Sequence, residues 1–313
     1  MKKVLVYYPK FLDQYEALLK KHIPDAHLMI CHDQADMERY APEAEVAFVG
    51  TTFPQEMFKK MPRLEWVQVM AAGVESFFKN AEQFKKIPVC RVLGGYGKYM
   101  AEYVFAYVLY LTQDVQRVLA AQRERCWDPF VPAYLFQKTF GIMGLGNIGM
   151  VVARKAKDVG MRVISWDAVQ KEAPFVDRKY GAHETEAFLG EADVVVLSLP
   201  VTPETVDSID WRIFKAMKNT AYLVNICRGA IVNEAHLVEA LKAKAIAGAV
   251  LDVMKQEPLP AKSPLWDCPN LILSPHLSGP SLPEDMVEVF KENFGRYLRG
   301  EPLLGRLDFE RGF

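Results

Sequence analysis

The stretch GIMGLGNIG, residues 141–149, decides how the centre of this chain folds. Its glycines have the spacing GxGxxG, at Gly144, Gly146 and Gly149. Residues 139–143 before this turn predict a strand, and residues 150–160 after it predict a helix that ends at Gly160. A lone GxGxxG is weak support for a cofactor site, but a strand, a glycine turn and a helix in this order are typical of one.

Each glycine of the turn has its own physical task. Gly144 permits the tight turn, Gly146 lets the backbone approach a pyrophosphate, and Gly149 lets helix and strand pack closely. The N-terminus of the helix offers N–H groups and a partial positive charge to the phosphates. The alternative, a purely structural glycine-rich turn, is disfavoured by the order of the elements around it.

An acidic residue, Asp167, follows the next predicted strand, residues 162–166. It lies about 20 residues beyond the glycines, where a carboxylate accepts hydrogen bonds from the adenosine ribose. The same carboxylate would repel a 2′-phosphate, so the sequence predicts NAD rather than NADP. Lys171 is a nearby positive charge that would favour NADP, and the competing interpretation of Asp167 is a surface aspartate.

Short apolar runs rich in β-branched residues alternate with longer amphipathic stretches along the whole chain. This alternation predicts an α/β protein built from βαβ units with mostly parallel sheets. The length of 313 residues suggests two domains. Strands are expected at residues 4–8, 27–31, 45–49, 65–70, 139–143, 162–166, 194–199, 222–226, 248–251 and 270–273.

Two helices stand out. Residues 99–125 predict one long helix, apolar nearly all round in its first half and charged in its second, which a second subunit would partly cover. Residues 283–300 predict a closing helix with a single apolar face. Core packing is the simpler interpretation of both. The apolar face of the helix at 283–300 carries Met286, Phe290, Phe294 and Tyr297.

The charge of the chain is nearly balanced, with 38 basic and 39 acidic residues. This balance argues against a nucleic-acid or membrane-surface protein, because both need a positive field. The N-terminus lacks the long apolar core of a signal peptide. The longest apolar stretch, residues 99–112, contains Glu102 and is too short to span a bilayer.

The cysteines are odd in number and form no CxxC pair. This pattern predicts a reduced, cytoplasmic protein without a disulfide framework, a zinc ribbon or another metal site. The five residues are Cys31, Cys90, Cys126, Cys227 and Cys268.

Several motifs, in this order, resemble those of the D-isomer-specific 2-hydroxyacid dehydrogenases. The resemblance is strongest over residues 135–279, and VMAAGVESF (69–77) and GGYGKYMAEYV (94–104) extend it weakly. It implies a Rossmann NAD-binding domain (99–280) inserted into a smaller flavodoxin-like, substrate-binding domain (1–98 plus 281–313). The motifs are LSLPVTPET (197–205), YLVNICRGAIVNEAHLVEAL (222–241), AGAVLDVMKQEPLP (247–260) and SPLWDCPNLILSPHLSG (263–279).

The resemblance implies a catalytic triad of Arg228, Glu257 and His276. A guanidinium pairs with a planar carboxylate through two hydrogen bonds and keeps its charge, which suits Arg228 to hold the acid. His276 would exchange a proton with the oxygen on C2, and Glu257 would orient its ring and favour the imidazolium. Taken alone, His276 could be a structural histidine, Glu257 a turn residue and Arg228 a surface charge. Taken together, all three follow the ends of predicted strands, where ligands bind in open α/β sheets.

Further contacts are implied by the same resemblance. Asp252 resembles the acid that binds the nicotinamide carboxamide. Thr205 and Pro200 resemble contacts on the adenine and ribose side, and helix capping is the alternative role for Thr205. The loop at 71–75 would bind the substrate carboxylate through backbone N–H groups, or be an ordinary turn. The expected substrate-binding residues are Ala72, Gly73, Val74, Tyr96 and Arg228. The expected cofactor-binding residues are Gly144, Gly146, Asn147, Ile148, Gly149, Asp167, Pro200, Thr205, Ile226, Cys227, Arg228, Asp252, His276 and Gly279.

Together these residues predict an NAD-dependent D-2-hydroxyacid dehydrogenase that works as a 2-oxoacid reductase. The family resemblance implies a homodimer formed through the helix at 99–125. The rival hypothesis is an NAD(H)-sensing scaffold that binds protein partners, similar to the C-terminal-binding-protein corepressors. The substrate stays open among glyoxylate, hydroxypyruvate, pyruvate and larger 2-oxo acids, because they share the same C1–C2 chemistry.

Overall fold

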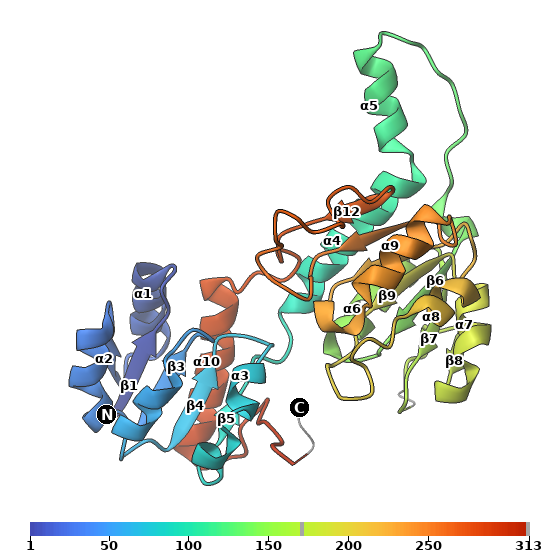
Figure 1. Cartoon of the computed structure of the whole chain (residues 1–313). Helices are drawn as coiled ribbons and strands as arrows, with labels where there is room; N and C mark the ends of the chain where they lie inside the picture. Colours follow the sequence, from blue (N-terminus) through green and yellow to red (C-terminus); the bar gives the residue numbers. More distant parts are fainter. Residues whose placement is uncertain (170–171, 311–313) are drawn as a thin grey trace. The chain divides into compact units, whose positions relative to one another are not determined.

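The computed structural model describes residues 1–169 and 172–310, so Lys171 lies outside the described residues. The chain divides into two compact units (Figure 1). Unit 1 comprises Met1–Gly95 with Ser281–Phe313, and unit 2 comprises Tyr96–Pro280. Unit 2 is therefore an insertion within the sequence of unit 1.

Unit 1 contains a five-stranded parallel sheet in the order β2-β1-β3-β4-β5. This order is that of the flavodoxin-like folds. The strands are β1 (Lys2–Tyr7), β2 (Ala26–Ile30), β3 (Val46–Val49), β4 (Trp66–Val69) and β5 (Val89–Cys90). The helices are α1 (Leu12–His22), α2 (Gln34–Tyr40), α3 (Glu75–Phe78) and α10 (Pro283–Arg299).

The predicted closing helix is confirmed as α10, and its apolar face enters the core of unit 1. Phe290 is fully buried and stacks on Phe48 of β3 and Trp66 of β4, with ring centroids 4.3 and 5.3 Å away. The buried Asn293 amide donates to Gln68 Oε1 at 2.8 Å, so a hydrogen bond also links α10 to β4. A segment more than 180 residues away in sequence thus completes the core of unit 1.

Unit 2 contains a seven-stranded parallel sheet in the order β12-β11-β10-β9-β6-β7-β8. The strand order reverses direction between β6 and β9, which is the switch point of a Rossmann fold. The strands are β6 (Thr139–Met143), β7 (Arg162–Trp166), β8 (Arg178–Tyr180), β9 (Val194–Leu197), β10 (Tyr222–Asn225), β11 (Gly248–Leu251) and β12 (Leu271–Leu273). The helices are α4 (Tyr96–Thr112), α5 (Val115–Arg123), α6 (Asn147–Asp158), α7 (Thr185–Glu191), α8 (Trp211–Ala216) and α9 (Glu234–Lys242).

The predicted α/β class and all ten predicted strands are confirmed, with ends that shift by up to two residues. Two strands escaped prediction, β5 and β8, because runs of two or three residues carry no periodic signal. In the part of the chain that the structure describes, no helix is both long and apolar enough to cross a bilayer.

The prediction of one helix over 99–125 is wrong, since the chain breaks there into α4 and α5. Asp114 adopts the left-handed conformation with φ 48°, which an aspartate tolerates better than most residues. The Gln113 side chain turns away to bond the Ala133 carbonyl at 3.1 Å. Helix α4 buries nine residues, whereas none of the nine residues of α5, all of them described, is buried.

We expect Phe290→Ala to lower the stability of unit 1 by about 3–5 kcal/mol, because a large buried ring would leave a cavity between β3 and β4. Leu298→Ala, on the same helix but 56% exposed, is the matched control. Urea denaturation followed by circular dichroism measures both. Equal midpoints for the two variants would show that the stack does not support the core.

Candidate active site

The glycine turn joins β6 to α6, and its three glycines differ in the space around them. Gly144 has φ 99°, and a Cβ there would lie 2.5 Å from the Ser198 carbonyl oxygen. A Cβ on Gly149 would lie 2.0 Å from the carbonyl oxygen of Gly144, so helix and turn pack with no room for a side chain. A Cβ on Gly146 would meet nothing within 4 Å. The open space at Gly146, directly before the N-terminus of α6, fits a pyrophosphate.

Asp167 lies at the carboxyl end of β7, next to this turn. Its Oδ2 accepts a hydrogen bond from Leu145 N at 2.7 Å, and its Oδ1 accepts one from Val169 N at 3.0 Å. The carboxyl group therefore holds the glycine turn, and its predicted contact with a ribose stays a prediction. Asn147 and Ile148, also predicted to contact the cofactor, form the first residues of α6.

The turn that carries Arg228 follows β10 and is closed by a buried amide. Asn225 Oδ1 accepts from Cys227 N at 3.0 Å, and its Nδ2 donates to the Arg228 carbonyl at 3.1 Å. The Cys227 thiol also donates to Asn225 Oδ1, at 3.0 Å. Burial raises the pKa of this thiol to about 11, so it stays a protonated donor.

Gly229 brings this turn against the loop that follows β11. A Cβ on Gly229 would lie 1.9 Å from the carbonyl carbon of Met254, so only glycine allows the two backbones to touch. Arg228 itself is half-buried and donates from Nη1 to the Cys227 carbonyl at 2.7 Å. The contact between Gly229 and Met254 fixes the spacing between Arg228 and the loop that carries Glu257.

Glu257 and His276 form a direct pair. His276 Nδ1 lies 2.7 Å from Glu257 Oε2, and Glu257 Oε1 accepts from Met254 N at 3.0 Å. The pair is partly exposed, with 47% of the His276 side chain and 35% of the Glu257 side chain accessible. With Nδ1 donating to the carboxylate, Nε2 is the imidazole nitrogen left to act on a ligand.

Asp252, at the carboxyl end of β11, is fully buried and serves the loop of His276. Its Oδ1 accepts from Ser274 Oγ at 2.7 Å and from Leu277 N at 2.9 Å, and its Oδ2 accepts from Ser278 N at 2.9 Å. Its backbone carbonyl accepts from His276 N at 2.9 Å. In this structure the carboxyl group is thus committed to the loop 274–278, and its predicted contact with a nicotinamide stays a prediction.

The remaining predicted cofactor residues lie along the same edge of unit 2. Thr205 Oγ1 accepts from Thr202 N and donates to the Pro200 carbonyl, each at 2.7 Å, so it closes the loop that follows β9. Ile226 is buried directly after β10. A Cβ on Gly279 would lie 3.0 Å from Met100 Cε of α4.

The predicted substrate residues fall in both units. Ala72, Gly73 and Val74 follow the carboxyl end of β4 in unit 1, where Val74 is buried and the other two are half-buried. Tyr96 opens α4 in unit 2, is 5% exposed and packs beside Gly279. The roles of all four residues stay predictions.

Sequence reasoning missed the side chains that support the site: Asn225, Ser274 and Tyr103. Asn225 did carry a signal, because a polar residue at the end of a buried strand needs hydrogen-bond partners. Ser274 and Tyr103 carried none. Their hydroxyl oxygens lie 2.6 Å apart in the fold, yet they are 171 positions apart in the sequence.

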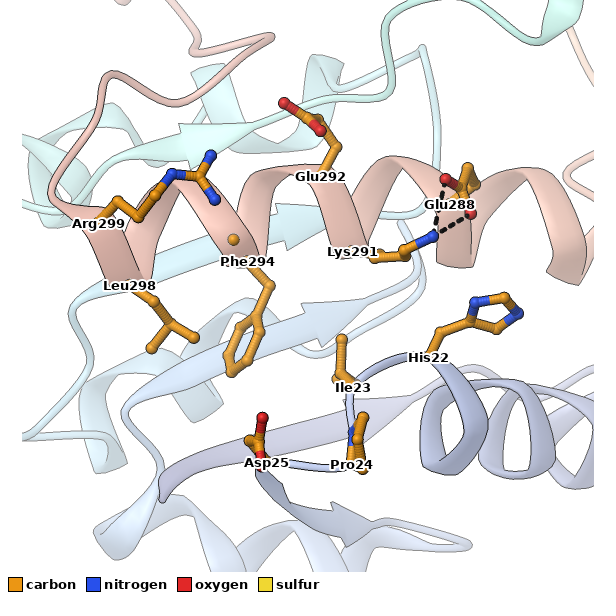
Figure 2. Close-up of a pocket in the computed structure, with 11 residues that line it drawn as sticks. His22, Ile23, Pro24, Asp25, Glu288, Lys291, Glu292, Phe294, Leu298 and Arg299 are labelled. Carbon is orange, nitrogen blue, oxygen red and sulfur yellow. Dashed lines mark hydrogen bonds and ion pairs between the residues drawn. The ribbon is translucent and has the colours of Figure 1, made fainter.

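A pocket of about 390 Å³ in unit 1 lies away from all these residues. Figure 2 shows it between the end of α1 and the face of α10, with Phe294 and Leu298 on one side and Ile23 and Asp25 on the other. Charged residues of both signs line it, so it favours no one charge of ligand. None of the site residues predicted from sequence is among its described lining residues.

Comparisons with known proteins identify relatives of this chain. The family model "D-isomer specific 2-hydroxyacid dehydrogenase, NAD binding domain" matches residues 105–278. Glyoxylate/hydroxypyruvate reductase A of Escherichia fergusonii is 34% identical over 257 residues, which cover 80% of this chain and 82% of the relative.

Solved structures extend the similarity to nearly the whole chain. A D-isomer specific 2-hydroxyacid dehydrogenase family protein from Aeromonas salmonicida superposes with a TM-score of 0.92 at 34% identity, covering 98% of this chain and 99% of that one. An NADPH-dependent glyoxylate/hydroxypyruvate reductase from Sinorhizobium meliloti, in complex with NADP and sulfate, superposes with a TM-score of 0.90 at 27% identity, covering all of both chains.

The glycine turn, the two parallel sheets and these matches lead to one conclusion. This chain belongs to the D-isomer specific 2-hydroxyacid dehydrogenase family, and it is an NAD(P)-dependent oxidoreductase that acts on the CH–OH group of its donors.

Proposed function

We propose that this chain reduces small 2-oxo acids of the glyoxylate and hydroxypyruvate type to the corresponding 2-hydroxy acids. The observation that carries the proposal is the 2.7 Å pair between His276 Nδ1 and Glu257 Oε2, held beside the turn of Arg228. The substrate class is supported by the relatives named as glyoxylate/hydroxypyruvate reductases. Binding of a dinucleotide at the same edge of the sheet is supported by the glycine turn, which leaves space open at Gly146.

Each residue of the triad has a task that its chemistry suits. The planar guanidinium of Arg228 binds the substrate carboxylate and polarises the carbonyl on C2. His276 Nε2 gives its proton to the oxygen on C2 as negative charge develops there. Glu257 fixes the ring through Nδ1, so that Nε2 faces the reaction. When bound, the nicotinamide supplies the hydride.

The residues proposed to bind the dinucleotide, the turn 144–149 and Asp167, belong to unit 2. The loop of Ala72, Gly73 and Val74 belongs to unit 1, and its proposed task is to bind a substrate carboxylate through backbone N–H groups. A glycine in that loop lets a ligand approach the backbone closely.

We expect the protein to oxidise NADH with glyoxylate or hydroxypyruvate, and His276→Ala to lower kcat by about 10²–10⁴-fold, as for loss of a general acid. His183→Ala, an exposed histidine of unit 2, is the matched control. Absorbance at the NADH band, with a panel of 2-oxo acids, measures the rates.

The panel also decides between the two hypotheses for the whole protein. Equal rates for His276→Ala and wild type would remove His276 from the mechanism. If NADH binds and no acid of the panel is reduced, the proposed substrate class fails, and an unusual substrate or the protein-binding scaffold takes its place.

We propose further that NAD is the preferred cofactor, although similar structures hold NADP. The support is the Asp167 carboxyl group at the end of β7, bonded to the glycine turn. A negative charge at this place accepts ribose hydroxyls and repels a 2′-phosphate. The next two residues, Ala168 and Val169, carry no charge, and Lys171 is the nearby positive charge in the sequence that would oppose this preference.

We expect wild type to have at least about tenfold higher kcat/KM with NADH than with NADPH, since like charges in contact cost several kcal/mol. Asp167→Asn removes the charge and keeps an oxygen for Leu145 N, so this ratio should fall by about tenfold. Asp177→Asn, in unit 2 beyond β7, controls for general loss of charge. A wild-type preference for NADPH would overturn this assignment of Asp167.

We propose that the protein is a homodimer in which the second copy covers the arm, defined as residues 115–137. Figure 1 shows α5 projecting from the rest of unit 2. Arg117 makes a bidentate pair with Asp128, at 2.6 and 2.8 Å, and lies over the ring of Phe130, so the arm has a defined form. Its apolar side chains are nevertheless exposed, which favours a partner surface. They include Val118, Leu119, Trp127, Val131 and Phe136.

A groove of about 740 Å³ lies between the arm and the amino ends of the strands of unit 2. Phe130 and Val131 line it from the arm, and Lys138, Asp193 and Tyr222 line it from the sheet. The amino ends of parallel strands form the edge opposite to the carboxyl ends. A second copy seated here would leave the edge of the triad accessible to substrate.

We expect the wild-type protein to sediment as a dimer and Trp127→Glu with Val131→Glu to sediment as a monomer, because buried charge would disrupt an apolar interface. Leu298→Glu, exposed on α10 outside the arm, should remain dimeric. Analytical ultracentrifugation at micromolar concentration makes the comparison. A monomeric wild type would exclude the proposed interface.

The five cysteines are all free thiols, and four of them are buried. Free thiols persist in reducing compartments, which supports the proposal that the protein works in the cytoplasm.

A further inference from the structure

A hydroxyl group on helix α4 reaches the loop of the proposed proton donor. We infer that Tyr103 is a positioning residue that anchors the loop 274–278, and with it His276, through Ser274 and Asp252. The inference rests on the proposed role of His276 and names a residue outside the triad.

The anchor is a continuous chain of hydrogen bonds inside unit 2. Tyr103 Oη lies 2.6 Å from Ser274 Oγ, and Ser274 Oγ lies 2.7 Å from Asp252 Oδ1. All three residues are buried, with 6%, 4% and 0% of their surface exposed. Buried polar groups without partners are costly, so each link supports the next.

The direction of the chain follows from the partners of Asp252. A carboxylate can only accept, so Ser274 must donate its single proton to Oδ1. Ser274 Oγ then has only lone pairs to offer Tyr103, and Tyr103 must donate. Burial raises the pKa of the Tyr103 phenol, so the donor stays protonated over the working range of pH.

The loop needs such an anchor because of its backbone. His276 has φ 52°, a left-handed conformation that costs free energy for a residue with a side chain. The conformation is held by bonds from His276 N to the Asp252 carbonyl and from Leu277 N and Ser278 N to the Asp252 carboxyl group. The position of the imidazole depends on this backbone as well as on Glu257.

Arg228 is supported separately, by the Asn225 amide. Weakening the Tyr103 chain should therefore disturb proton transfer and leave carboxylate binding intact. This difference predicts a change in kcat with little change in KM, which a general loss of packing would not produce.

The test uses Tyr103→Phe, which removes the hydroxyl and keeps the ring. Tyr107→Phe is the matched control, since Tyr107 lies one turn along α4 with its ring centroid 4.6 Å from that of Tyr103. With NADH and the best 2-oxo acid of the panel, Tyr103→Phe should lower kcat by about fivefold, the effect of one hydrogen bond, with KM changed by less than about twofold. Tyr107→Phe should match wild type.

A double-variant cycle tests whether Tyr103 acts through Ser274. Ser274→Ala should lower kcat by about tenfold, and adding Tyr103→Phe to it should lower kcat no further. If the two substitutions lower kcat independently, so that their effects multiply, Tyr103 does not act through Ser274. A Tyr103→Phe variant that behaves like Tyr107→Phe, or one that raises KM at constant kcat, would also overturn the inference.

Hydrogen exchange separates this inference from the proposed function. In the protein without substrate, the amides of residues 276–278 should exchange faster in Tyr103→Phe than in wild type or Tyr107→Phe. If wild type reduces no acid and the exchange still differs, the proposed function fails while the anchor stands. Equal exchange in all three proteins would refute the anchor whatever the activity.

Discussion

Parallel pairing of the seven strands of unit 2 is the constraint on which the candidate site depends. It brings every strand to the same edge with its carboxyl end, so loops far apart in sequence become neighbours. The glycine turn follows β6, Arg228 follows β10 and His276 follows β12. A single antiparallel strand among them would send its loop to the opposite edge. The switch point between β6 and β9 opens the space beside the glycine turn.

The loops at this edge share one structural device. A polar side chain at or just beyond the end of a strand binds the backbone of a turn: Asp167 holds Leu145, Asn225 holds the Arg228 turn, and Asp252 holds the loop of His276. Turns that bind ligands must be rigid without a regular ladder of their own. A short side chain, buried at Asn225 and Asp252 and half-buried at Asp167, supplies the missing partners at little cost in conformational entropy.

Sequence alone predicted the elements whose signal is local. The glycine turn, Asp167 and the ten longer strands are readable because turn chemistry and apolar periodicity lie within a few residues. The break at Asp114 could not be read, since the apolar pattern of residues 99–112 runs up to it and a left-handed aspartate leaves no periodic mark. Tyr103 and Ser274 could not be paired, because only the finished fold brings α4 next to β12. The family resemblance identified the triad, but it did not indicate that Asn225 and Asp252 hold the loops of Arg228 and His276.

The aromatic stack of α10 in unit 1 has a consequence for synthesis on the ribosome. Phe48 and Trp66 are made early, but Phe290, which stacks on both, is made only after the whole of unit 2. During translation the face of β3 and β4 that α10 will cover therefore stays exposed while the 185 inserted residues, Tyr96–Pro280, leave the exit tunnel and fold. Apolar surface exposed for that time attracts other chains and chaperones. The vulnerable stage in the life of this protein is thus the nascent chain, before its closing helix has been added.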